Sequence, residues 1–138
     1  MARSQVAARS HRRPLRCAHG AAQREAIDLI GIGRRFFSPI EHADLSSQTG
    51  DNMTRAFFRA WTRKESYLKA RGAGLSLPFD GFDVTLLPDQ EPRLLATRFD
   101  PGDAARWTLS ELDPAGGYAG ALCADFGEQA IHTFTWTP

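Results

Sequence analysis

The strongest helical pattern in the sequence is MTRAFFRAWTRKESYLKARG, residues 53–72. Apolar aromatic and aliphatic side chains recur in it at helical spacing: Phe57, Phe58, Trp61 and Leu68. Residues three and four apart lie on one side of a helix, so these side chains form one apolar face. Gly72 suits the left-handed residue that ends many helices. The pattern predicts a helix from about Met53 to Arg71 that docks one side on a sheet.

Two shorter helices are predicted before this one. The first covers about residues 25–37, although Gly31 and Gly33 each cost about 1 kcal/mol relative to alanine in a helix interior. The second opens at Ser38-Pro39-Ile40-Glu41, which supplies an N-cap serine, a proline at the first helical position and an acid in the first turn. It extends to about Leu45.

After the long helix the apolar period changes to two, and Pro, Gly and Asp turns separate the segments. Five strands are predicted: Phe82–Leu87, Leu94–Phe99, Trp107–Leu112, Tyr118–Ala124 and Ile131–Trp136. A chain of 138 residues has room for one modest domain with one core. The predicted fold class is therefore α+β, with one long helix and short helices packed on an antiparallel sheet.

Charge divides the chain into two unlike parts. The first 24 residues hold six arginines and no acid, so the remainder carries more acidic than basic side chains. We expect residues 1–24 to be a disordered or non-native basic segment, with an organellar transit peptide as an alternative, and residues 25–138 to be the domain.

The acidic charge of residues 25–138 argues against a nucleic-acid partner, and no apolar run is long enough for a membrane span. Cys17 and Cys123 lie far apart, with no C-x-x-C or metal spacing, so neither a disulfide framework nor a zinc site is indicated, which favours a cytoplasmic location.

The candidate chemistry lies in the long helix. The chain contains 15 arginines but only two lysines, and these two, Lys64 and Lys69, bracket Glu65. Trp61, Glu65 and Lys69 are spaced four apart, so one helix face carries an aromatic ring, a carboxylate and an ammonium. A lysine suits a phosphate and a carboxylate suits a hard cation such as Mg²⁺. The alternative is an exposed ion pair worth about 0.2–0.5 kcal/mol with no function.

Residues 61–72 resemble a known signature, W-x-x-K-E-[SA]-x-x-K-x-x-G, of the 4'-phosphopantetheinyl transferase superfamily. Other segments resemble the C-terminal half of its surfactin-type branch: residues 34–39 with Glu41, 74–78, 82–84, Trp107 and 117–122. The resemblance covers about residues 24–126. It implies that the chain adopts one half of a pseudo-duplicated fold.

The resemblance also implies an activity. Members of this family transfer the 4'-phosphopantetheine of coenzyme A to a serine of an acyl or peptidyl carrier protein and require Mg²⁺. By resemblance, Glu65 and Lys69 are the catalytic residues, with Glu65 as metal ligand and base. Lys69, Lys64 and Trp61 would bind coenzyme A.

One departure from the family concerns the metal site. Surfactin-type members carry an upstream G-[IV]-D-x-E strand, which would fall near residues 17–22, where this chain has no acid. Asp28 is a single carboxylate, and Gly31-Ile32-Gly33 is followed by arginines rather than the aspartate of the smaller synthases. Because Mg²⁺ needs near-octahedral oxygen ligation, we expect transfer that is impaired by truncation. The alternative is an inactive fragment or a non-catalytic carrier-protein-binding module. A missing N-terminal half, or self-association, is the expected further partner.

Overall fold

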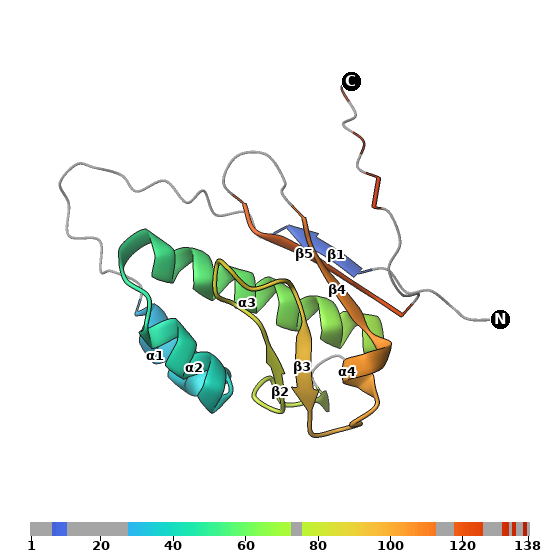
Figure 1. Cartoon of the computed structure of the whole chain (residues 1–138), viewed down its shortest axis with the longest axis horizontal. Coiled ribbons are helices and arrows are strands. Elements are labelled where there is room, and N and C mark those ends of the chain that lie inside the picture. The colour runs from blue at the N-terminus through green and yellow to red at the C-terminus, as the bar shows by residue number, and fades with distance from the viewer. Residues whose placement is uncertain are drawn as a thin grey trace.

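The computed structural model describes residues 7–10, 28–72, 76–112, 118–125, 131, 132, 134 and 137. Along the chain the elements are β1 (Ala7–Ser10), α1 (Leu29–Phe36), α2 (Pro39–Ser46), α3 (Gly50–Arg71), β2 (Phe82–Val84), β3 (Leu94–Thr97), α4 (Asp103–Arg106), β4 (Thr108–Leu112) and β5 (Gly120–Ala124). Figure 1 shows α3 through the middle of the molecule, with α1 and α2 beside its first half.

The long helix confirms the prediction in its position and its end. It begins three residues before the predicted start, at Gly50, and finishes at Arg71. Gly72 follows with φ 69°, in the left-handed region that a residue without a Cβ adopts at little cost. The local sequence therefore determines where α3 ends.

The two short helices also follow their predicted signals. In α1, the Asp28 side chain accepts a hydrogen bond from the Gly31 amide at 2.8 Å, so the helix begins four residues later than predicted. In α2, Ser38 and Glu41 form a reciprocal capping box, and Pro39 occupies the first turn. A Cβ at Gly33 would come within 2.8 Å of the Leu45 side chain, so this glycine lets α1 approach α2 closely.

The described strands form two sheets rather than the single sheet that the sequence predicts. One sheet has the order β1-β5-β4 and the other pairs β2 with β3, all antiparallel. The four predicted strands at 82–87, 94–99, 107–112 and 118–124 correspond to β2, β3, β4 and β5, each shorter than predicted. Ile131, His132 and Phe134 are not in a strand, and the rest of that predicted strand lies outside the described residues.

Two described elements were not predicted. β1 lies inside the basic segment 1–24, so the disorder expected there does not extend to residues 7–10. The short helix α4 connects β3 to β4. β1 reads Ala-Ala-Arg-Ser and shows no alternation of apolar and polar residues. α4 is a single turn of four residues, too short to show helical periodicity.

The core lies between α3 and its neighbouring strands and helices. Its most deeply buried side chains come from α2, α3, the segment 82–86 and β5: Leu45, Ala56, Ala60, Tyr67, Phe82, Leu86 and Cys123. Burying such side chains is the main favourable contribution to folding. Within the described ranges, no helix combines the length and apolarity needed to cross a bilayer.

Candidate functional site

Trp61 and Glu65 face each other on α3, one turn apart. The indole Nε1 donates a hydrogen bond to Glu65 Oε1 at 2.8 Å. Lys69 follows one turn later with an exposed side chain, while Trp61 and Glu65 are half-buried. The predicted order of aromatic ring, carboxylate and ammonium therefore exists on one face of this helix.

Aromatic side chains fix the position of the Trp61 ring. Its ring centre lies 4.9 Å from that of Phe79, 5.8 Å from Phe57, 6.1 Å from Phe36 and 6.5 Å from Phe37. Rings at such separations attract one another beyond their burial of apolar area. The indole is held between α1, α3 and the loop before β2, so its N–H stays directed at Glu65.

The Lys64 side chain points into the core, unlike that of its neighbour Glu65. Its side chain is 0% exposed, and Nζ donates to Glu41 Oε1 at 2.8 Å and to the Phe82 carbonyl at 2.6 Å. The ammonium also lies 4.0 Å from the centre of the Phe82 ring. Lys64 therefore lies in the interior, whereas Lys69 is exposed, and the part in coenzyme A binding that the resemblance implies for Lys64 stays a prediction.

Glu41 is the counterion that sequence reasoning missed. Its Oε1 also accepts from the Val84 amide at 2.8 Å, and its Oε2 accepts from the Ser38 amide at 3.0 Å. Burial raises the pKa of Glu41, against the lowering effect of Lys64, and burial lowers the pKa of Lys64, against the raising effect of Glu41. The pair joins α2, α3 and β2 directly behind the face that carries Glu65.

One sequence signal points to this pair. Lys64 falls in phase with Phe57, Ala60 and Leu68, which the structure buries on the core side of α3. A lysine in an apolar stripe requires a buried partner, because an unpaired charge is expensive to remove from water. The position of Lys64 in the apolar stripe indicates that a buried carboxylate must be nearby. It does not indicate that Glu41 is that carboxylate.

The described residues do not by themselves fit a Mg²⁺ site. They contain no group of three His, Cys, Asp or Glu side chains placed to hold a metal ion. Glu65 Oε1 already accepts the Trp61 N–H, and Asp28 caps α1. One carboxylate beside a lysine gives Mg²⁺ too few oxygen ligands.

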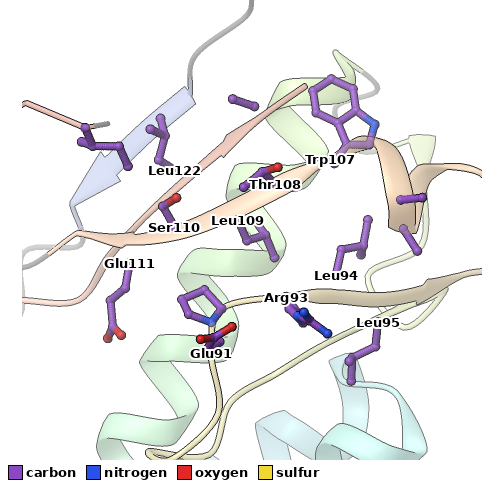
Figure 2. Close-up of a pocket in the computed structure, with 15 residues that line it drawn as sticks. Glu91, Arg93, Leu94, Leu95, Trp107, Thr108, Leu109, Ser110, Glu111 and Leu122 are labelled. Atoms are coloured by element: carbon purple, nitrogen blue, oxygen red, sulfur yellow. The ribbon is translucent and has the colours of Figure 1, made fainter. Parts of the chain in front are cut away.

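A cavity of about 890 Å³ opens between β3 and β4, away from this face (Figure 2). Its lining includes Leu94 and Leu95 on one side and Leu109 and Glu111 on the other. A second cavity, of about 240 Å³, lies at the end of α3 beside Arg71. Trp61, Glu65 and Lys69 line neither of them.

Comparison with known proteins matches the segment that carries this face to a protein family. The profile of the 4'-phosphopantetheinyl transferase superfamily matches residues 17–123. The chain is 39% identical over 102 residues to the 4'-phosphopantetheinyl transferase Sfp of Bacillus subtilis strain 168, covering 72% of this chain and 44% of that protein. It is 35% identical over 115 residues to the 4'-phosphopantetheinyl transferase HetI of Nostoc, covering 83% of this chain and 42% of that protein.

The chain thus spans less than half the length of these curated relatives. A solved structure of similar size has the same fold: apo-ACPS from Chronobacterium ammoiniagenes aligns with a TM-score of 0.52 and 16% identity, over 88% of this chain and 96% of that one. The α+β fold class is confirmed by this likeness. With the family profile matching most of its length, and Trp61, Glu65 and Lys69 inside the match, the chain belongs to the 4'-phosphopantetheinyl transferase superfamily.

Proposed function

We propose that this chain acts in the cytoplasm in the transfer of 4'-phosphopantetheine from coenzyme A to a serine of an acyl or peptidyl carrier protein. The observation that carries the proposal is the single face of α3 on which Trp61 donates to Glu65 and Lys69 follows one turn later. The whole face lies within the segment that matches the superfamily.

Each of these side chains has a proposed role. The ammonium of Lys69 is exposed, so it can pair with a phosphate of coenzyme A. Glu65 takes the proton of the carrier serine as the serine oxygen attacks the phosphorus that bears the pantetheine arm. The bond from that phosphorus to the bridging oxygen breaks, and 3',5'-adenosine bisphosphate leaves with that oxygen. Trp61 orients the Glu65 carboxylate through its 2.8 Å hydrogen bond.

The role proposed for Lys64 is indirect. Because its ammonium is held by Glu41 and the Phe82 carbonyl, Lys64 supports the helix that carries Glu65 and Lys69. It binds no phosphate in this proposal.

We propose that Mg²⁺ binds at Glu65 only when ligands outside the described residues complete its coordination. Waters, phosphate oxygens of coenzyme A and a further carboxylate would join Glu65 around the ion. The curated relatives are more than twice as long as the matched part of this chain, so a second polypeptide segment is the proposed source of that carboxylate.

Intact-mass analysis of an apo carrier protein tests the transfer. The carrier is incubated with the purified chain and coenzyme A, with Mg²⁺ in one arm and EDTA in the other. A mass gain of one phosphopantetheine, lost in Glu65→Gln and Lys69→Ala, supports the proposed transfer and contradicts the need for a second polypeptide segment. Arg55→Ala, near the N-terminal end of α3, and Glu91→Gln, in the segment between β2 and β3, both at exposed residues, are the matched controls. No gain from the folded chain contradicts unaided transfer.

A second candidate function is binding of the carrier protein without catalysis. The single carboxylate on the helix face favours it, because a docking surface does not require a metal site. Titration calorimetry with the apo carrier distinguishes the two candidates. Binding without any mass gain, unchanged by EDTA, identifies the binding module.

A further inference from the structure

The cavity between β3 and β4 lies where each of the two sheets ends. Among the described strands, β4 pairs only with β5, and β3 pairs only with β2. Both β3 and β4 line the cavity, and Figure 2 shows Leu94 of β3 and Leu109 of β4 directed into the space between the two strands. A strand edge without a partner presents N–H and C=O groups that an extended segment can bind. The cavity is therefore a groove beside a free backbone edge.

Both faces of β4 contribute side chains to this groove. Leu109 lies on the core face, because its register partner is Cys123 and both belong to the core cluster. Ser110 and Leu122 are paired on the opposite face, and they line the groove together with Leu109. A strand added beside β4 would therefore meet apolar side chains on the core face and mixed ones on the other.

A segment with the composition of a strand follows β5 along the chain. Residues 131–136 read Ile-His-Thr-Phe-Thr-Trp, and β-branched and aromatic residues of this kind favour strands. In the structure Ile131 lines the groove and is 42% exposed, while Phe134 is 91% exposed. Both residues lie beyond residue 123, where the match with the superfamily ends. The transferase chemistry thus leaves this pattern, and its exposed apolar side chains, without a role.

The chain is long enough to bring residues 131–136 to the free edge of β4. β5 ends at Ala124, whose register partner is Thr108, the first residue of β4. Six residues separate Ala124 from Ile131. At about 3.3 Å per residue they reach farther than the distance of about 10 Å across one intervening strand. A strand that begins there runs parallel to β4, from Thr108 toward Leu112, and its six residues match the five of β4 in length.

We propose that residues 131–136 are a strap, which closes the groove in solution by adding a strand to the free edge of β4. Phe134 then packs on the Leu109 side, whereas Ile131 and the two threonines lie on the Leu122 side, because alternate residues of a strand point to opposite faces.

The strap has an open and a closed position. The structure has Phe134 in water, and burial of this ring together with pairing of the β4 edge favours the closed position. The occupant is the chain's own segment, because a tether of six residues holds it at a high effective concentration beside the groove.

Hydrogen exchange of the β4 amides, measured residue by residue by NMR, tests the strap. The β4 amides that do not donate to β5 face the free edge, and a closed strap protects them. Phe134→Asp places a charge in the strap, and Thr137→Asp places the same charge at an exposed residue just outside it. We expect the edge amides to exchange about tenfold faster in Phe134→Asp and at the parent rate in Thr137→Asp, with the α3 amides unchanged. Equal edge rates in the parent and Phe134→Asp would overturn the proposal.

A peptide corresponding to residues 130–137 separates loss of the strap from a wider loss of structure. Added to the Phe134→Asp variant, it should restore slow exchange of the β4 edge amides, whereas the same peptide with Phe134→Asp should not. If the α3 amides also exchange faster in the variant, their recovery on peptide addition supports the proposal and its absence contradicts it.

The exchange rates are measured at low and at high chain concentration. Protection of the β4 edge that is the same at both supports closure by the chain's own segment. Protection found only at high concentration would show that a second copy supplies the strand, and would overturn the proposal. The assay uses neither coenzyme A nor carrier protein, so its result is independent of the proposed function.

Discussion

The ammonium of Lys64 lies 2.8 Å from the carboxylate of Glu41, and both side chains are almost completely removed from solvent. Glu41 also binds the amides of Ser38 and Val84, so one carboxylate links three parts of the chain. Glu65, the next residue after Lys64, is directed instead at Trp61. The buried pair thus fixes the rotation of α3 that keeps Glu65 on the outer face.

Replacing Lys64 with methionine should strongly destabilise the fold. The change leaves Glu41 buried without its counterion, which typically costs about 3–5 kcal/mol. Urea unfolding followed by circular dichroism measures the loss. The double variant Glu41→Gln/Lys64→Met should recover much of it, because no lone charge remains buried. A double variant as unstable as Lys64→Met would show that the charge is not the cause.

Replacing Lys69 with alanine should weaken coenzyme A binding by about tenfold, the expected loss of one charge-assisted hydrogen bond. Because the side chain is exposed, the melting temperature should not change. Titration calorimetry gives the affinity, and Arg55→Ala is the control for removal of a positive charge from α3. Equal affinities in the two variants would remove Lys69 from the site.

The end of α3 is held by a second buried carboxylate. Asp103 is 2% exposed, and its Oδ2 accepts from Tyr67 Oη at 2.6 Å and from Arg71. Asp103→Ala should lower the free energy of unfolding by about 1–3 kcal/mol, because the buried Tyr67 hydroxyl is left without its acceptor. Tyr67→Phe should cost less, about 1 kcal/mol, since Asp103 keeps Arg71. Urea unfolding of both variants tests this order, and the reverse order would contradict it.

Stability should fall at alkaline pH because of Cys123. Burial raises the pKa of its thiol from 9.0 to about 12. Between these values the unfolded chain releases the proton while the folded chain keeps it, so the free energy of unfolding falls by about 1.4 kcal/mol per pH unit above pH 9. Below pH 9 the thiol is protonated in both states and has no effect on the pH dependence. Cys123→Ala, measured at pH 8, 9 and 10, should show a shallower fall, and parallel curves would contradict the assignment.

Local signals predicted the helices α1, α2 and α3, but not the single turn α4. Gly72 ends α3 as predicted, and Ser38, Pro39 and Glu41 begin α2 as predicted. These features depend on residues within one or two turns, which the sequence displays directly. The face of Trp61, Glu65 and Lys69 was predictable for the same reason, since helical spacing alone places them together.

The strands were predicted less well. The alternating pattern located β2, β3, β4 and β5 approximately, but not their division into two sheets. β1 reads Ala-Ala-Arg-Ser, without an alternating apolar pattern, so its pairing with β5 was not predicted. An alternating pattern can locate a strand, but it does not indicate which distant strand will pair with it.

The sequence by itself determined the long helix, its end at Gly72 and the order of side chains along its outer face, because these follow from short-range sterics and helical spacing. Only the tertiary structure decided that Lys64 faces inward to Glu41, 23 residues away in the chain, and that Ala7 lies beside Cys123. Both contacts join segments that are brought together by packing of the core. Their energies depend on removal of water, which no local pattern of residues specifies.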